Sequence, residues 1–539
     1  MADEMRSYRP MAIGRRGAVA ANHPLAAQAG LLALRAGGNA IDAAVATAAA
    51  LAVVEPMMSG LGGDGFYHVF QQATGRAVVF NGTGPAPQAA TPERYAGGIP
   101  RIGPLSVSVP GTLAGLGMMH REFGRLPWSA LFTEAIRLAR DGFGATRAYC
   151  HFAEDHRETL LVDPRATEIF LVNGRAPGLG AAIVQPDLAH TLDEIAADGA
   201  ESFYRGKLAR RLAAGLEAAG ALVRDSDLAA FTAEAQEPIA IDYRGYTVLE
   251  APPNSTGCVL LEELKIIEHL DLAGMGLLSA DAVHAMVEAK KLAFADRERW
   301  VTDPRTLEAP LDRLLSEDYT AGLAARIDMR RAAPNRTAPE AAAAGDTTYF
   351  CTADGEGNAV SGIQSINSGF GAGVMAGDTG ILLNNRMAYW HLEPGHPNRL
   401  VPGRRVRHTM NPPIVLKDGK LWCVFGTPGA DNQVQINLQV LTAMIDCGLD
   451  PQQAAEMPRW TSNVPGQYAN WPHHGEDALT IERRFPEAVR AELARRGHPV
   501  ATVGDLDGPC SVEIIRYDTA NGMLLAGSDP RRDGWALAW

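Results

Sequence analysis

An abrupt change of composition near residue 345 constrains the fold of this chain more than any other feature. Residues 331–344 are rich in proline and alanine, which is typical of an exposed linker. The β-branched and aromatic segment Gly345–Ala353 follows at once and predicts a strand. Asp354–Asn358 predicts a hairpin turn, and Ala359–Asn367 predicts the returning strand. The linker therefore leads directly into the start of a strand, and the residue there is a threonine, Thr347.

A threonine at the start of a strand is normally structural, but the preceding linker offers Thr347 a second interpretation. If the Asp346–Thr347 bond were cleaved, Thr347 would carry a free α-amino group beside its hydroxyl. That amine has an ordinary pKa of about 8 and can accept the hydroxyl proton near neutral pH. An N-terminal amine is one of the groups that activate a threonine hydroxyl as a nucleophile, without a histidine or an aspartate.

Two further segments are candidates for a site beside Thr347. On the returning strand, Ser365 and Asn367 share a face because side chains alternate with period two. The alternative for this pair is a solvated polar face of the sheet. Gly429 and Ala430 lie where a loop leads into a predicted helix, so their N–H groups could hold an oxyanion. An ordinary helix start is the commoner explanation of such a loop.

Histidines supply two weaker signals. His408 lies in a polar cluster with Arg404, Arg405 and Arg407 and could bind an anion, but a solvated basic segment is the favoured alternative. His473-His474 has no third ligand nearby in the sequence, which predicts a surface pair rather than a metal site.

The composition favours a large folded protein and excludes several classes. The chain has 539 residues and is 46% hydrophobic, so it can bury a sizeable core as several domains or as one large layered domain. Its net charge of −13 offers no basic face for nucleic acid. The six cysteines stand singly, so we expect reduced thiols and no zinc site. We expect no metal and no organic cofactor.

Three segments bear on cofactor binding, membrane and location. Gly60–Gly65 matches a G-x-G-x-x-G pattern, but it follows a predicted helix and precedes a strand, the wrong order for a dinucleotide site. The longest apolar stretch, Ala43–Val54, is too short to span a bilayer. No apolar signal segment is apparent near the start, which predicts a cytoplasmic protein unless a signal was trimmed. Ala282–Trp300 predicts a long helix with interleaved charges.

Motifs along essentially the whole chain resemble those of the gamma-glutamyltransferase family of N-terminal nucleophile hydrolases. They occur in one order at Gly38–Ala46, Ser59–Gly63, Val109–Thr112, Leu138–Gly142, Tyr243–Tyr246, Pro252–Ser255, Asp346–Thr348, Ala376–Asn385, Thr427–Gly429 and Ser528–Arg531. The resemblance implies an α+β fold, a four-layer αββα sandwich. It also implies that the precursor cuts itself at Asp346–Thr347 into fragments 1–346 and 347–539, which form one intertwined unit.

The resemblance implies a role for each catalytic candidate. The Thr347 hydroxyl would first attack the preceding carbonyl, and in turnover it would attack a substrate amide and form an acyl-enzyme. Ser365 stands where the family has a threonine that hydrogen-bonds the nucleophile. Asn367 matches a substrate-facing asparagine. Gly429 and Ala430 stand at the oxyanion pair, and Ala430 still offers an N–H.

The sequence departs from the family where glutathione-cleaving members hold the glutamate. Asn81 replaces an arginine, and His408-Thr409 replaces a pair of serines. Arg386 and Tyr389 replace a glutamine and an acidic residue. The clamp for the α-amino group has thus lost an anion and gained a cation, which repels an ammonium by about 1 kcal/mol or more. Arg386 with His408 could instead hold a carboxylate. A short lid, His391–Pro402, predicts a more open site.

These departures favour a self-processing amidohydrolase that acts on a small, carboxylate-bearing amide, as oxamate amidohydrolases and glutaryl-type cephalosporin acylases do. The alternative within the family is a true γ-glutamyl hydrolase or transpeptidase acting on glutathione and γ-glutamyl amides. The alternative from another class is an unprocessed, non-catalytic relative that binds a ligand. Retention of Thr347, Ser365, Asn367 and Gly429 speaks against that last alternative. The two fragments of one precursor are the expected partners, and further dimerisation is left open.

Overall fold

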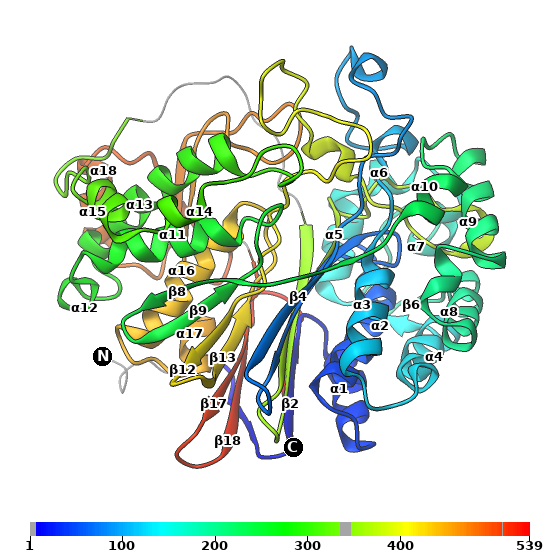
Figure 1. Cartoon of the computed structure of the whole chain (residues 1–539), viewed down its shortest axis with the longest axis horizontal. Coiled ribbons are helices and arrows are strands. Elements are labelled where there is room, and N and C mark those ends of the chain that lie inside the picture. The colour runs from blue at the N-terminus through cyan, green and yellow to red at the C-terminus, as the bar shows by residue number, and fades with distance from the viewer. Residues whose placement is uncertain (1–6, 335–345, 509) are drawn as a thin grey trace.

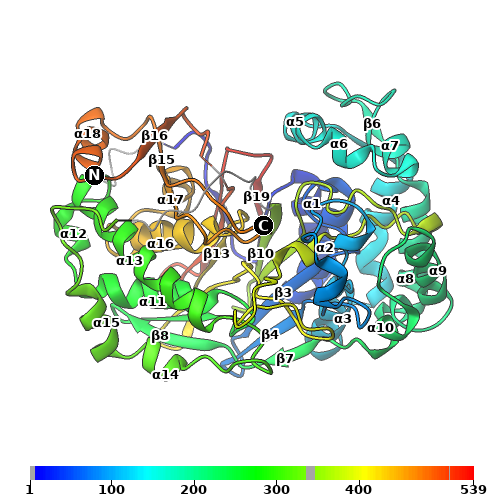
Figure 2. The ribbon, with the colours of Figure 1, turned by 90° about the horizontal axis from the view of Figure 1, so that it is seen from above.

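The computed structural model describes residues 7–334, 346–508 and 510–539. Within these residues, two seven-stranded antiparallel sheets stack face to face, and helices cover the outer face of each (Figures 1 and 2). The predicted four-layer αββα sandwich is confirmed. Only residues 331–334 of the predicted linker are among the described residues, and the rest of it lies outside them.

The first sheet has the strand order β1-β18-β17-β13-β12-β9-β8. Its strands are β1 (Ala12–Gly14), β18 (Met523–Ser528), β17 (Glu513–Asp518), β13 (Lys420–Gly426), β12 (Ile414–Lys417), β9 (Tyr246–Glu250) and β8 (Ile239–Tyr243). The second sheet has the order β19-β2-β10-β11-β3-β4-β7. Its strands are β19 (Trp535–Ala538), β2 (Gly17–Ala21), β10 (Asp346–Asp354), β11 (Ala359–Asn367), β3 (Asp64–Gln71), β4 (Arg76–Gly82) and β7 (Glu234–Gln236).

Each outer layer consists of helices from a different part of the chain. The second sheet is covered from α1 to α10: α1 (Pro24–Arg35), α2 (Ala40–Val54), α3 (Thr112–Phe123), α4 (Thr133–Asp141), α5 (Arg147–Asp155), α6 (Arg157–Leu160), α7 (Pro164–Phe170), α8 (Pro186–Asp198), α9 (Lys207–Ala218) and α10 (Asp225–Ala230). The first sheet is covered from α11 to α18: α11 (Gly257–Glu268), α12 (Leu272–Met275), α13 (Ala280–Trp300), α14 (Leu311–Leu314), α15 (Glu317–Ala324), α16 (Asn432–Ile445), α17 (Pro451–Glu456) and α18 (Glu487–Arg495). Short strands outside the two large sheets are β5 (Phe143–Gly144), β6 (Ala182–Ile183), β14 (Trp460–Asn463), β15 (Ala478–Glu482) and β16 (Val500–Val503).

Three hydrophobic cores separate the four layers, and strand periodicity distributes side chains between them. On β10, Tyr349 and Cys351 belong to the core between the sheets, while Phe350 belongs to the core under the helices. On β11, Ile363 faces the other sheet and Val360 faces the helices. Successive residues of a strand point to opposite faces, so a strand buried on both faces is apolar throughout.

Both sheets interleave strands that precede and follow residue 346. In the second sheet, β10 pairs with β2 and β11 pairs with β3. In the first sheet, β12 pairs with β9 on one side and with β13 on the other. Cleavage before Thr347 would therefore leave the two parts joined through both sheets and all three cores.

The glycine-rich segment after α2 lies between a helix and a strand, in the order predicted from the sequence. Asn39 caps α2 in a reciprocal capping box with Asp42, and all residues of the helix are buried. The chain then passes through Gly60–Gly63 into β3, so the order is helix, loop, strand. Among the described residues, no helix is long and apolar enough to cross a membrane.

Candidate active site

Thr347 lies at the open end of the hairpin between β10 and β11, away from the turn, where the ladder is irregular. Asp346 pairs with Asn367 and Thr348 with Gln364, so Thr347 alone opposes two residues of β11. This β-bulge turns the strand and brings the Thr347 hydroxyl to Ser365, to which it donates a hydrogen bond of 3.3 Å. The predicted hairpin is confirmed, and the strand begins at Asp346, whose side chain lies outside the described residues.

Ser365 is oriented by the backbone that follows it. The N–H of Asn367 donates to Ser365 Oγ at 2.8 Å. Asn367 has a φ of +82°, a backbone conformation that is unfavourable for residues other than glycine. The Asn367 amide nitrogen donates to the carbonyl of Asn385 at 3.1 Å and to Asn470 Oδ1 at 2.9 Å. The structure thus places Ser365 and Asn367 together beside Thr347, not on a solvated sheet face.

The loop with Gly429 and Ala430 approaches the same end of the sandwich from the other sheet. Gly426, the last residue of β13, lies against the ring of Tyr349 on β10, where a β-carbon would come within 2.5 Å of the ring. Gly429 (φ +126°) and Ala430 (φ +50°) then have left-handed backbone before α16 begins. A β-carbon on Gly429 would meet Cys510 Sγ at 2.2 Å. Such consecutive turns can direct backbone N–H groups to one anion.

A buried ion pair lies behind the hydroxyls. Asp64 is the residue of β3 that pairs with Ser365, so their side chains share the face between the sheets. Arg386, on the 3₁₀ helix Arg386–Tyr389, places Nε 3.1 Å from Asp64 Oδ2 and Nη1 3.4 Å from Asn367 Oδ1. Both charged side chains are at most 1% exposed. Burial raises the pKa of the Asp64 carboxyl, and the charge of Arg386 opposes that rise.

This pair corrects the charge balance expected from the sequence. Arg386 was predicted to add an unbalanced cation, but Asp64 supplies the anion. Among the described residues, Arg386 Nη2 is buried without a hydrogen-bond partner, while the guanidinium lies 4.5 Å from the ring centre of Tyr389. The pair therefore adds no net charge to this buried region and retains one unused N–H donor group.

His408 borders the ion pair, and the favoured interpretation of its segment was wrong. His408 is fully buried, with Nε2 3.8 Å from Asp64 Oδ2 and its ring against Phe66 and Tyr389. Arg405 and Arg407 are not solvated either, since both are buried and paired with Glu234 and Glu298. Burial, followed by the charge of Arg386, lowers the pKa of His408 well below its usual range, so the ring is neutral at pH 7.

Comparison with known proteins identifies the family of this chain. Residues 26–539 match the family model described as Gamma-glutamyltranspeptidase. The chain belongs to the gamma-glutamyltranspeptidase family. It is 39% identical to the glutathione hydrolase-like YwrD proenzyme of Bacillus subtilis (strain 168), over 97% of this chain and 99% of that protein. It is 38% identical to the oxamate amidohydrolase proenzyme of Klebsiella pneumoniae subsp. pneumoniae, over 98% and 99% of the two chains.

A solved structure extends the likeness to three dimensions. The crystal structure of the cephalosporin acylase from Bacillus halodurans matches with a TM-score of 0.91 at 37% identity, covering 99% of this chain and 98% of that one. The chain is thus an enzyme of the gamma-glutamyltranspeptidase family, whose members are amide hydrolases and acyltransferases.

In this gamma-glutamyltranspeptidase family member, Asn81, a substrate-binding candidate from the sequence, hydrogen-bonds to neighbouring polar side chains. Its Nδ2 donates to Asn254 Oδ1 at 3.0 Å and to Gln236, while its Oδ1 accepts from the hydroxyl of Thr83 at 2.6 Å. The carbonyl of Asn254 accepts from the backbone N–H of His408 at 2.7 Å. Asn81 therefore supports the segment that holds His408, with its own polar atoms engaged by the protein.

The remaining predicted residues lie beside the same ion pair. The hydroxyls of Tyr389 and Thr409 are 3.1 Å apart, and both side chains are buried. The lid His391–Pro402 is held by Asn398, whose Nδ2 donates to the carbonyl of Tyr389 at 3.1 Å. The expected open site is not observed, because the site side chains are at most 4% exposed in the single uncleaved chain.

Three residues near the site were missed by the sequence reasoning. Asp64 lies inside Gly60–Gly65, which was considered only as a dinucleotide-binding pattern; the signal for it was an acid at the start of a buried strand. Glu55 accepts a hydrogen bond from the Thr348 hydroxyl, and burial raises its pKa to about 7. Lys290 is buried on α13, donates to the carbonyl of Ser462 at 2.8 Å, and has a pKa lowered by burial to about 7.

Lys290 borders a small cavity next to the proposed oxyanion loop. The cavity has a volume of about 30 Å³, and its walls include Lys290, Phe294, Gly429 and Ala430. His473, predicted at the surface, is buried nearby: its ring stacks 3.5 Å from that of His391, and its Nδ1 lies 2.9 Å from the carbonyl of Tyr468.

Proposed function

We propose that the chain is a self-processing N-terminal threonine amidohydrolase for small amides whose acyl group bears a carboxylate, of the oxamate or glutaryl type. One observation carries this proposal. A continuous set of hydrogen bonds runs from the Thr347 hydroxyl through Ser365 and Asn367 to the guanidinium of Arg386. A nucleophile and a carboxylate-binding group are thereby held in one rigid arrangement.

The processing step follows from the position of Thr347. Its Oγ attacks the carbonyl carbon of Asp346, the peptide C–N bond breaks, and an ester replaces the amide. Water then hydrolyses the ester, leaving a carboxylate on Asp346 and a free amine and hydroxyl on Thr347. The products are fragments 1–346 and 347–539, which the shared sheets keep together.

Turnover repeats this chemistry on a substrate. The new α-amine accepts the proton of the Thr347 hydroxyl, the oxygen attacks the substrate amide carbon, and the tetrahedral oxyanion is stabilised by N–H groups at Gly429 and Ala430. The amine leaves with a proton, and water or a second amine takes the acyl group from Thr347.

Arg386 supports a carboxylate in the acyl group. Its Nη2 is unused, whereas its other nitrogens contact Asp64 and Asn367. A substrate carboxylate accepting from Nη2 would satisfy a buried donor that otherwise costs about 1–3 kcal/mol. The printed names of the relatives from Klebsiella pneumoniae and Bacillus halodurans, an oxamate amidohydrolase and a cephalosporin acylase, agree with this class.

Asp64 favours the second candidate, a γ-glutamyl hydrolase or transpeptidase. A buried carboxylate beside the pocket could accept hydrogen bonds from the α-ammonium of a glutamyl group, although Arg386 already occupies one of its oxygens. The glutathione hydrolase-like name of the relative from Bacillus subtilis agrees with this candidate.

Two anilides with one leaving group separate these candidates, because γ-glutamyl and glutaryl anilides differ only in the α-amino group. We expect kcat/KM on the processed enzyme to favour the glutaryl anilide at least about tenfold, equivalent to about 1.4 kcal/mol. A ratio that favours γ-glutamyl anilide would reject the carboxylate-only pocket. A purified chain that stays uncut and turns over neither substrate would favour the non-catalytic relative.

A further inference from the structure

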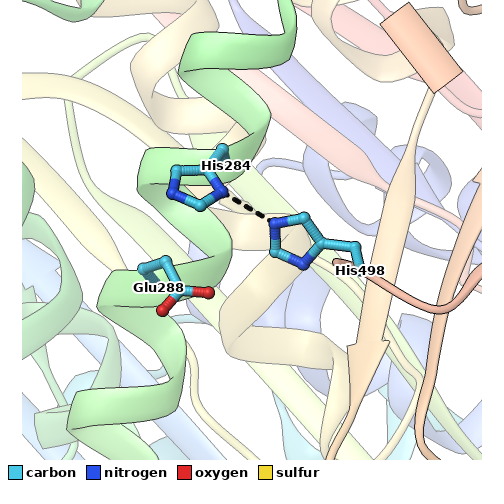
Figure 3. Close-up of side chains that lie close together, drawn as sticks. All are labelled: His284, Glu288 and His498. Atoms are coloured by element: carbon cyan, nitrogen blue, oxygen red, sulfur yellow. Dashed lines mark hydrogen bonds between the residues drawn. The ribbon is translucent and has the colours of Figure 1, made fainter. Parts of the chain in front are cut away.

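A second group of polar side chains lies outside the candidate active site, on the helical layer over the first sheet. His284 and Glu288 are one turn apart on α13, so their side chains lie on the same face of the helix. His498, in the turn between α18 and β16, meets them there (Figure 3). All three side chains are buried, and one potential ligand atom from each lies within 4.8 Å of the others.

His284 is held in an orientation that suits a metal ligand, and His498 faces it. His284 Nε2 lies 2.9 Å from the carbonyl of Asp328, which keeps a proton on Nε2 and leaves a lone pair on Nδ1. That Nδ1 faces His498 Nε2 at 2.8 Å. A carbonyl on the far nitrogen is the usual support of a metal-bound histidine. A metal ion between the rings would replace the proton they share, and the His498 proton would move to its Nδ1.

The spacing fits a small divalent ion after a slight separation of the rings. At zinc–nitrogen distances of about 2.0–2.1 Å, two nitrogens of a tetrahedral site are about 3.4 Å apart. The observed 2.8 Å requires a shift of about half an ångström. Two imidazoles and a carboxylate form a zinc-type donor set that leaves one position for water.

The charges around the cluster tolerate a cation. Glu288 Oε1 accepts from Lys291 at 2.8 Å, and Glu288 Oε2 accepts from the backbone N–H of Ala333 at 3.1 Å. Arg496 is the other nearby cation, and it pairs with Asp281 and Glu492. With both histidines neutral, these side chains carry one net negative charge.

A second group in the described part of the chain, Glu298 with His391 and His396, lacks these properties. Glu298 already pairs with Arg297 and Arg407. The rings of His391 and His396 stack 3.5 Å apart and 9° from parallel, so their in-plane lone pairs do not converge on one point.

We propose that His284, Glu288 and His498 bind one divalent transition-metal ion, zinc or its chemical analogues. If the chain is cut before Thr347, a step that rests on the proposed function, the ion bridges the two fragments. His284 and Glu288 would belong to the first fragment and His498 to the second. The segment leading to the cut is docked at the same place, where the N–H of Ala332 donates to the carbonyl of Arg496 at 2.8 Å.

Titration of the metal-stripped protein with zinc, against a competing chromogenic chelator, tests the proposal. We expect one zinc ion per chain in the wild type and in Thr347→Ala, which keeps the chain uncut and removes any dependence on processing. His498→Gln and Glu288→Gln should each weaken binding at least about 100-fold, because each removes a ligand. Cobalt(II) should give the visible absorption of a four-coordinate site, and both variants should lose it.

His396→Gln, in the second group, is the matched control and should bind like the wild type. Absence of stoichiometric zinc in the folded wild type would overturn the proposal, as would unchanged binding in His498→Gln and Glu288→Gln. The bridging role has its own readout: a chelator should lower the urea concentration at which processed fragments separate. If Thr347→Ala binds zinc but the wild type is never cut, the metal site stands and the proposed processing fails.

Discussion

The open end of the β10–β11 hairpin and the buried ion pair behind it differ in how they are built. At the hairpin end, Thr347, Ser365 and Asn367 lie within 21 residues of sequence and interact through neutral hydroxyl and amide groups. In the pocket, Asp64 and Arg386 are 322 residues apart and form a charged pair that is almost fully buried. The comparison teaches that local register positions the proposed nucleophile, whereas distant contacts set the charge that a substrate meets.

The largest expected effect tests the hairpin end. Thr347→Ala should leave one uncut chain, because it has no hydroxyl to attack Asp346, and should lower kcat at least about 10⁴-fold. Electrophoresis and anilide hydrolysis measure the two effects. Thr348→Ala is the neighbouring control and should still be cut, and Thr347→Ser should be cut more slowly. Normal fragments from Thr347→Ala would remove the nucleophile assignment.

The next effect tests the pocket. Asp64→Asn leaves the Arg386 charge buried without its partner, so the free energy of unfolding should fall by about 3–5 kcal/mol. Adding Arg386→Gln should restore part of that loss, which a double-mutant cycle from urea unfolding measures. In turnover, Arg386→Gln alone should lower glutaryl preference. Additive losses in the cycle would show that the two side chains do not depend on each other.

The pH dependence of the free energy of unfolding tests whether Glu55, beside the hairpin end, is uncharged in the folded chain. Glu55 contacts Thr348, and its folded-state pKa of about 7 exceeds its ordinary value of 4.5. The folded chain therefore holds a proton that the unfolded chain releases between these values, so stability falls as pH rises from about 4.5 to 7. Relative to Glu55→Gln, the loss should be on the order of 3 kcal/mol.

Urea unfolding at pH 5 and pH 8, with both proteins in the Thr347→Ala background, measures this loss on a single uncut chain. Parallel stability curves for the two proteins would show that Glu55 titrates as an exposed carboxyl does.

The smallest expected effect separates orientation from nucleophilicity. Ser365→Ala removes the acceptor of the Thr347 hydroxyl and should lower kcat by about 10–100-fold with little change in KM. Ser365→Thr keeps the hydroxyl and should recover most of the rate. An unchanged kcat in Ser365→Ala would mean that the 3.3 Å contact does not orient the attacking oxygen.

Sequence reasoning succeeded where neighbouring residues set the geometry. The hairpin around Asp354–Asn358, the order of helix and strand around Gly60–Gly65, and the proximity of Ser365 to Thr347 all depend on local periodicity and turn chemistry. The bulge at Thr347 was not predicted, because it depends on the pairing of two strands.

The misses share one cause. Arg386 was predicted as an unpaired cation, the segment around His408 as solvated, and His473 as a surface residue. Each is buried by parts of the chain distant in sequence, which no local pattern reports. The same holds for His284 and His498, which are 214 residues apart and were invisible to a search for closely spaced metal ligands.

The sequence alone indicated the family and, through that resemblance, the αββα layers, and it singled out Thr347 as the proposed nucleophile, because motif order and the linker-to-strand transition are local properties. The tertiary structure decided what surrounds that residue. The buried Asp64–Arg386 ion pair, the uncharged His408 and the buried His284–Glu288–His498 group form only in the folded chain. There, removal of water makes each charge depend on the partner that the fold places beside it.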